Sequence, residues 1–193
     1  MTGEPAYVGV DPGMSGAFAI WRPADDMLFV LDMPTHEING KNRIDLYRLG
    51  HELRAWAAVA KIERVTVELV NAMPPMRDRF GQQRGAGTAS SFAFGFAAGA
   101  AQMAVAALDL PMVLVVPQVW KKVYGLRGGA ENKDMSRQKA SMLFPKYAHN
   151  WARKKDDGRA ESVLLAHYGS KLVGWATLRP PLRSALQGST SPR

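Results

Sequence analysis

Short apolar runs, separated by polar breaks, dominate the first part of the chain. The runs Tyr7–Val10, Ala17–Trp21 and Met27–Met33 are rich in β-forming residues. The breaks between them are the glycine-rich Gly13–Gly16 and the turn-like Pro23–Asp26. Tight breaks between short apolar runs are typical of hairpins. The pattern therefore predicts three strands joined as a meander.

Helical periodicity follows these strands. Apolar residues recur at roughly helical spacing over Asn42–Lys61, which predicts a helix. The next run, Arg64–Val70, is β-branched and apolar with Glu68 inside it, which predicts a fourth strand. Residues 71–87 are polar, rich in Pro and Gly, and have no apolar period. A loop this long within a compact domain is usually functional or disordered.

The second half of the chain alternates between helical and strand patterns. Thr88–Leu108 is small and apolar almost throughout, which predicts a buried helix, and Pro111–Val116 predicts a further strand. Three more helices are expected: a short one opened by Pro117, one over Asn132–Phe144, and an amphipathic one over Gly158–Gly169. This order predicts an α/β fold with a mixed five-stranded sheet flanked by helices, three antiparallel strands coming before the parallel ones.

Length and composition favour one domain. The chain has 193 residues, 47% of them hydrophobic, and no cysteine. We expect a single domain over residues 1–174 and a flexible basic tail over residues 175–193, where periodicity is lost. The absence of cysteine excludes disulfides and thiolate metal sites. No signal-peptide pattern and no uninterrupted apolar run of about 18 residues is present, so we expect a cytoplasmic protein with no membrane partner.

The charge balance points to an anionic partner. Lys and Arg number 25 against 17 Asp and Glu, a formal net charge of +8. Nucleic acid is the commonest polyanion for a soluble domain of this charge. A basic protein without a polyanion partner is the alternative.

Four carboxylates carry the candidate chemistry. Asp11 ends the first strand and Glu68 lies within the fourth, so both could lie on adjacent central strands. On the final helix, Asp157 and Glu161 differ by about 40° and share a face, whereas Asp156 lies about 140° from Glu161 and could instead cap the helix. Clustered acids repel one another unless a cation neutralises them. Oxygen-only ligands suit Mg²⁺ or Mn²⁺, and two such ions can activate water against a phosphodiester.

Each acid also has a structural interpretation. An Asp before Pro-Gly is usually a turn residue, and acids at a helix start usually serve capping or the helix dipole. Glu68 fits such an interpretation least, because a glutamate in an apolar strand is rarely buried without a partner.

Five segments together resemble a known family. They read GVDPGMSGAFAI, VTVELV, GQQRGAGTASSFAFGFAAG, VPQVWKKVYGL and KKDDGRAESVLLAHYG, in that order between Tyr7 and Gly174. They are similar to the successive motifs of the RuvC family of Holliday-junction resolvases, and most similar to its phage and chloroplast branches. The resemblance implies an RNase H-like fold, a homodimer, and divalent metal used to nick paired strands of a four-way DNA junction symmetrically.

The resemblance also assigns residues. It places metal ligands at Asp11, Glu68 and Glu161, and the remaining ligand position often falls at what is here Gly158. This chain offers Asp157 one residue earlier, with Asp156 as the alternative. The predicted catalytic and metal-binding set, holding two Mg²⁺ ions with Mn²⁺ as the alternative, is Asp11, Glu68, Asp157 and Glu161.

Basic and polar residues near these acids are the predicted DNA contacts, with solvated surface charge as the alternative. The set also includes one aromatic candidate for a junction wedge, Phe80. It consists of Arg77, Arg79, Phe80, Gln82, Gln83, Arg84, Lys121, Lys122, Lys133, Arg137, Lys139, Lys154, Lys155 and Arg159. By spacing alone the Phe92–Ala107 helix packs on the sheet. The resemblance raises a helix–helix dimer contact as the alternative.

The sequence thus predicts a metal-dependent endonuclease that resolves four-way junctions by paired nicks in DNA recombination and repair. We expect it in the host cytoplasm if a phage encodes it. Three alternatives stay open: a nuclease that also cuts flaps and forks, a module that binds junctions without cutting, and an actin-like or sugar-kinase-like ATPase. The ATPase is suggested by GVDPGMSG, but that fold needs two domains and this chain has room for one.

Overall fold

A five-stranded mixed sheet forms the centre of the molecule. The computed structural model describes residues 3–69, 76–77, 83–84, 87–127 and 133–174. The strand order is β3-β2-β1-β6-β9, with the first three strands antiparallel and β6 and β9 parallel to β1. The predicted mixed sheet is confirmed. Its strands are β1 (Pro5–Asp11), β2 (Ala17–Arg22), β3 (Met27–Asp32), β6 (Lys61–Glu68) and β9 (Met112–Val115).

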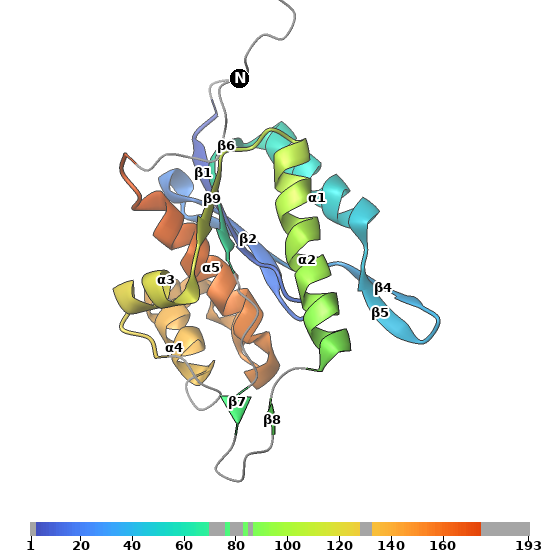
Figure 1. Cartoon of the computed structure of the whole chain (residues 1–193). Coiled ribbons are helices and arrows are strands. Elements are labelled where there is room, and N and C mark those ends of the chain that lie inside the picture. The colour runs from blue at the N-terminus through green and yellow to red at the C-terminus, as the bar shows by residue number, and fades with distance from the viewer. Residues whose placement is uncertain (1–2, 70–75, 78–82, 85–86, 128–132, 175–193) are drawn as a thin grey trace, which may run out of the picture.

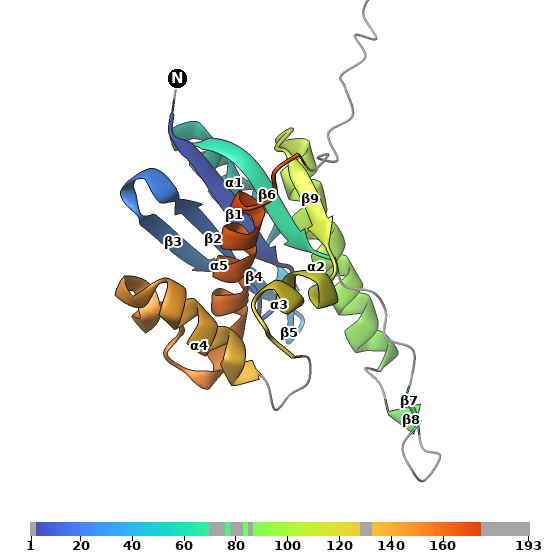
Figure 2. The same cartoon turned by 90° about the vertical axis from the view of Figure 1, so that its left-hand side faces the viewer.

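Helices cover both faces of the sheet (Figures 1 and 2). One face carries α1 (Leu46–Val59) and α2 (Thr88–Ala107), and the other carries α5 (Asp157–Ser170), flanked by α3 (Pro117–Val123) and α4 (Lys133–Leu143). Short 3₁₀ turns complete the connections: η1 (Pro23–Asp25), η3 (Pro145–Trp151) and η4 (Lys154–Asp156). Each helical layer closes its own apolar core, one lined by Val8, Val10, Val65 and Val67, the other by Trp120, Trp151 and Leu164.

The predicted helix over Asn42–Lys61 begins too early. A two-stranded antiparallel hairpin, β4 (Thr35–Ile38) and β5 (Lys41–Ile44), precedes α1, and Asp45 caps that helix by accepting a hydrogen bond from the Arg48 amide. The hairpin turns at Asn39-Gly40, both with positive φ, 51° and 69°. Asn-Gly is the dipeptide that a two-residue turn of this kind favours. The sequence therefore contained the hairpin signal, although apolar spacing masked it.

The other boundaries shift by a few residues. Glu68 is the last residue of β6 rather than a residue inside the strand, and α5 begins at Asp157 rather than Gly158. Within the polar segment 71–87 the structure describes a short antiparallel pair, β7 (Met76–Arg77) and β8 (Gln83–Arg84). The predicted tail over residues 175–193 lies outside the described residues, so the domain boundary stays a prediction.

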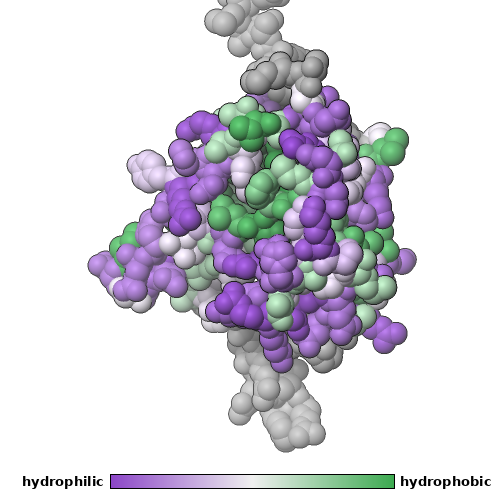
Figure 3. All heavy atoms as spheres, turned by 180° about the vertical axis from the view of Figure 1, so that it is seen from behind, coloured by the Kyte–Doolittle hydropathy of each residue, from purple (hydrophilic) through white to green (hydrophobic). Residues whose placement is uncertain are grey.

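Apolar side chains also reach the surface. Seen from behind, they gather in a hollow rimmed by polar residues (Figure 3).

The stretch Ala89–Ala107 of α2 is the one helix, among the residues that the structure describes, long and apolar enough to cross a membrane by length and composition alone, and 22% of it is buried. Its residues Ala97, Ala101 and Val105 pack in the core. One side of α2 thus belongs to the core, while much of the rest is open.

Candidate active site

Strand alternation brings Asp11 and Glu68 to the same corner of the sheet. In the parallel pair of β1 and β6, Val10 lies opposite Val67, so the residues that follow them are neighbours at the carboxyl ends of the two central strands. Successive side chains of a strand point to opposite faces. Because Val10 and Val67 belong to the core under α1 and α2, Asp11 and Glu68 point toward α5. The expectation that the two acids lie on adjacent central strands is confirmed.

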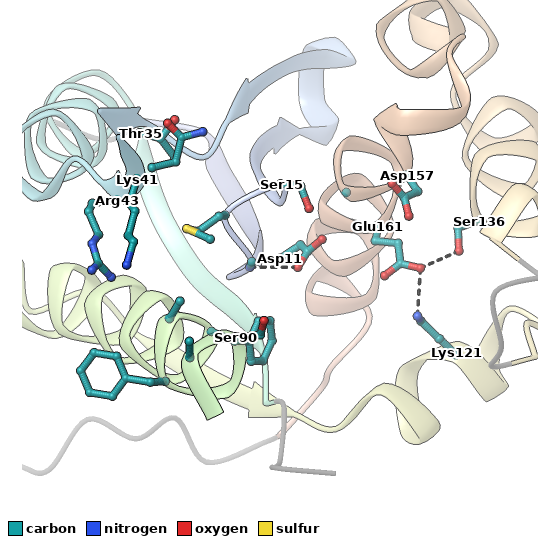
Figure 4. Close-up of a pocket in the computed structure, with 18 of the residues that line it drawn as sticks. Asp11, Ser15, Thr35, Lys41, Arg43, Ser90, Lys121, Ser136, Asp157 and Glu161 are labelled. Carbon is teal, nitrogen blue, oxygen red and sulfur yellow. Dashed lines mark hydrogen bonds and ion pairs between the residues drawn. The ribbon is translucent and has the colours of Figure 1, made fainter. Parts of the chain in front are cut away.

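Helix α5 brings two more carboxylates to this corner. Asp157 and Glu161 line the same cavity as Asp11 (Figure 4). Gly158 lies between them, where α5 meets the β1–β2 turn. A Cβ at that position would lie 2.7 Å from the Ser15 carbonyl oxygen and 3.0 Å from Asp11 Oδ2. A longer side chain therefore does not fit at 158 in this packing, which gives a physical reason for the acid to stand at 157.

The carboxylates act on one another electrostatically. The pKa of Asp11 is raised from 3.8 to about 7, mainly by burial and also by the negative charges of Glu68 and Glu161. Burial also raises the pKa of Glu68, again with help from Glu161. A hydrogen bond from the Gly13 amide to Asp11 Oδ1, 3.3 Å long, opposes this only in part. The corner thus concentrates negative charge that favours a bound cation.

Three polar partners hold these acids. The Trp120 indole Nε1 donates to Glu68 Oε1 at 2.9 Å. Glu161 Oε1 accepts from Ser136 Oγ and contacts Lys121 Nζ, each at 2.9 Å (Figure 4). Lys121 also lowers the pKa of Asp11 and Glu68 by its positive charge. The Lys121 ammonium therefore acts as the local counter-charge of the cluster.

Asp156 has a different environment from Asp157. Its carboxylate is buried and accepts hydrogen bonds from the backbone amide and the guanidinium of Arg153, at 3.0 and 2.8 Å. These bonds hold its pKa below the usual range. Asp156 does not line the cavity that Asp157 lines. It stabilises the turn before α5, as its helical position suggested, and Asp157 is the better placed of the two.

The donor set suits a hard divalent cation. Carboxylate oxygens are the ligands that Mg²⁺ and Mn²⁺ prefer, and a cation would offset both the burial and the mutual repulsion that raise the pKa values of Asp11 and Glu68. As they stand, the described side chains form no group of three or more His, Cys, Asp or Glu that could hold a metal ion. Glu161 is turned to Lys121 and Ser136. Metal binding would therefore require side chains of the cluster to turn toward one another.

The predicted DNA contacts fall into three groups. Lys121 lines the cavity, while Lys122, Lys154 and Lys155 are exposed on α3 and η4. Lys133 and Lys139 lie on α4, and Arg77, Gln83 and Arg84 lie in β7 and β8. Arg79, Phe80 and Gln82 lie outside the described residues. All of these assignments stay predictions.

Besides Lys121, which pairs with Glu161, two arginines among the predicted contacts have partners within the fold. Arg137 pairs with Asp134 at 2.6 Å and donates to the Ala152 carbonyl at 3.0 Å. Arg159 pairs with Asp32 on β3 and donates to the Asn150 carbonyl at 3.0 Å. Both guanidinium groups join separate segments in this structure, and their contact with DNA stays a prediction.

Sequence reasoning missed several residues around the site. In the sequence, Trp120 is only one residue of the VPQVWKKVYGL segment, and no pattern marks Ser136. Lys41 and Arg43 lie in β5, most of which overlaps the helix predicted to begin at Asn42, and both line the cavity, whose volume is about 1470 Å³. The Asn39-Gly40 turn was the signal that would have placed them. No comparable signal existed for Trp120, because its contact with Glu68 spans distant segments.

Comparison with known proteins supports the fold. No model of a known protein family matches the chain, and no curated protein matches its sequence. The structure of T. thermophilus RuvC in complex with a Holliday junction substrate aligns with a TM-score of 0.50 and 16% identity, over 84% of this chain and 90% of that one. A second Thermus thermophilus RuvC structure aligns with a TM-score of 0.47 and 16% identity, over 84% and 91%. The first likeness confirms the predicted RNase H-like fold. The phage and chloroplast branch stays a prediction.

Proposed function

We propose that this protein is a metal-dependent endonuclease that resolves four-way DNA junctions. The observation that carries the proposal is the convergence of acids from β1, β6 and α5 at one corner of an RNase H-like sheet. Burial, together with repulsion from Glu68 and Glu161, raises the pKa of Asp11 there to about 7. Binding DNA without cutting it gains nothing from acids that face phosphate. The fold-level neighbour whose structure contains a Holliday junction substrate supports branched DNA as the substrate class.

Each residue of the site has a role in this proposal. Asp11, Glu68, Asp157 and Glu161 would hold the divalent ions, which when bound supply an activated water and stabilise the leaving oxygen of a phosphodiester. Trp120 fixes one oxygen of Glu68. Lys121 balances the charge of Glu161 in the metal-free protein. The net charge of +8 favours approach of the DNA.

Paired nicks require two sites, and α2 supplies a surface for a homodimer. Phe92, Phe96, Gly99 and Met103 lie along one stripe of this helix at helical spacing, and the three large side chains are 69%, 44% and 63% exposed. A Cβ at Gly99 would meet nothing within 4 Å. An open apolar stripe with a small residue at its centre suits close packing against the same helix of a second copy. Sedimentation velocity at micromolar concentration tests this, since a monomer would contradict paired nicking.

A cleavage assay tests the activity. Labelled four-way junction, fork, flap and linear duplex are incubated with Mg²⁺, with Mn²⁺ and with EDTA. We expect metal-dependent symmetric nicks in the junction. Asp11→Asn should abolish cutting and leave junction binding intact, while Asp25→Asn, a surface acid paired with Arg22, should change neither. No metal-dependent cutting of any branched substrate would overturn the proposal, and equal cutting of forks and flaps would broaden its substrate class.

A further inference from the structure

The hairpin of β4 and β5 carries positive charge on one face. Alternation along the strands puts Lys41 and Arg43 of β5 on the same face, opposite Ile38 and His36 of β4. The acidic residue of the hairpin, Glu37, pairs with Asn42 and points to the other face. The two basic side chains thus form a pair without an acid on their own face of the hairpin.

Both basic side chains line the cavity that Asp11, Asp157 and Glu161 line. In Figure 4 they extend from the hairpin toward α2, on the side of the cavity away from Glu161 and Lys121. Met14 and Phe94 line the cavity as well. The cavity therefore has an acidic wall on β1 and α5, a basic wall on the hairpin, and apolar surface of the kind that accepts sugars and base faces.

The fold holds the hairpin in place at its base. Ile44 at the end of β5 is buried in the core beside Leu49 and Leu53 of α1. Asp45, the next residue, caps α1 and lies 3.7 Å from the His36 imidazole. The two-residue turn at Asn39-Gly40 fixes the register of the strands. Lys41 and Arg43 are therefore presented by a supported element rather than by an open loop.

We propose that this hairpin is a phosphate-binding arm, in which Lys41 and Arg43 contact the DNA backbone on the far side of the cavity from the cutting site. The inference rests on the proposed function and extends it. The predicted DNA contacts lie on α3, on α4, in segment 71–87, and just before and within the first turn of α5, so the hairpin adds a contact surface from another part of the chain. A strand that passes over the carboxylates would be held at the hairpin as well.

Binding measurements test the arm directly. Fluorescence anisotropy with a labelled four-way junction is followed in EDTA over a range of salt concentrations, using the full chain with Asp11→Asn so that no cutting occurs. Adding Lys41→Ala and Arg43→Ala should weaken binding about tenfold at low salt and reduce the salt slope by about 2, because two phosphate contacts are lost. The conservative pair Lys41→Arg and Arg43→Lys should retain most of the binding.

A matched pair of substitutions controls for the loss of charge. Arg48→Ala and Lys61→Ala also remove two positive charges, but these side chains pair with Glu52 and Glu63 and do not line the cavity. This control should bind within about twofold of the parent. Thermal melting checks that each variant is folded. The proposal is overturned if the hairpin pair binds like the control pair, whereas failure of the parent chain to bind or cut any branched DNA would overturn the proposed function itself.

Discussion

Trp120 Nε1 donates a hydrogen bond of 2.9 Å to Glu68 Oε1, and both side chains are buried. The next residue of α3, Lys121, contacts Glu161 at 2.9 Å, and its ammonium lies 5.1 Å from the centre of the Trp120 ring. Two consecutive residues of one short helix therefore hold two of the four acids. Helix α3 thus orients Glu68 and Glu161, although it contributes no acid to the cluster.

Replacing Trp120 by Phe should impair the site more than the fold. The substitution leaves Glu68 Oε1 without its donor in a buried place, which typically costs about 1–3 kcal/mol of stability. Because outer partners orient metal ligands, we also expect metal affinity to fall about 10- to 100-fold. Metal titration followed by thermal shift measures both effects.

Trp151→Phe is the matched control for this substitution. Trp151 is also buried and donates a hydrogen bond of 2.9 Å, but to Ser141, away from the acids. It should lower stability without moving the metal titration midpoint. Equal shifts of the midpoint in the two variants would show that Trp120 has only a packing role.

Lys121→Met should lower the stability of the metal-free protein and strengthen its binding of metal. Without the ammonium, the repulsion among Asp11, Glu68 and Glu161 loses its counter-charge, so the melting temperature in EDTA at pH 8 should fall. Glu161 is then free to turn toward a metal, and the stabilisation gained on adding Mg²⁺ should rise. The exposed neighbour Lys122 provides the control Lys122→Met. Weaker metal binding by Lys121→Met would contradict competition between this lysine and the metal.

Asp11→Asn should stabilise the metal-free protein at neutral pH. The pKa of Asp11 is raised from 3.8 to about 7, so its folded form binds a proton more tightly than the unfolded chain does. Proton binding by Asp11 therefore adds its full amount to the free energy of unfolding below pH 3.8, and this stabilisation is lost as the pH rises from 3.8 to about 7. We expect the variant to exceed the wild type by at least about 1 kcal/mol at pH 8, since one pKa unit corresponds to about 1.4 kcal/mol. The advantage should disappear toward pH 4.

Urea unfolding in EDTA from pH 4 to pH 8 measures this difference. His167 titrates in the same range with the opposite sign, because burial, with the charge of Lys171, lowers its pKa to about 4. The folded protein favours the neutral imidazole, so the stabilisation that His167 gives is lost as the pH falls from 6.5 to about 4. That effect is common to both proteins and cancels in the comparison. Equal stability of the two proteins at pH 8 would show that ionised Asp11 does not destabilise the folded protein.

The sequence predicted the sheet well because local pattern determines much of it. The apolar runs over Tyr7–Val10 and Ala17–Trp21 lie inside β1 and β2. Asp11 and Glu68 lie side by side at the ends of the central strands, as the strand pattern predicts. Local pattern failed at the β4–β5 hairpin, where apolar residues at helical spacing outweighed a two-residue turn signal. The environment of the acids was less accessible, because the contact of Glu68 with Trp120 spans 52 residues. Such pairings depend on how α3 packs, which no local period encodes.

The adjacent acids Asp156 and Asp157 should separate stability from catalysis. Asp156→Asn weakens a buried carboxylate that binds the amide and guanidinium of Arg153, and loss of such a cap costs about 0.5–2 kcal/mol. We expect lower stability with cutting retained at temperatures where the variant is folded. Asp157→Asn removes a charge at the cavity beside Asp11 and Glu161, so cutting should fall by more than about 100-fold even at temperatures where the variant is fully folded. Urea unfolding and single-turnover cleavage, performed on both variants, give the two readouts. The reverse result, with Asp156→Asn inactive and fully stable, would move the ligand to Asp156 and require the turn before α5 to rearrange when metal binds.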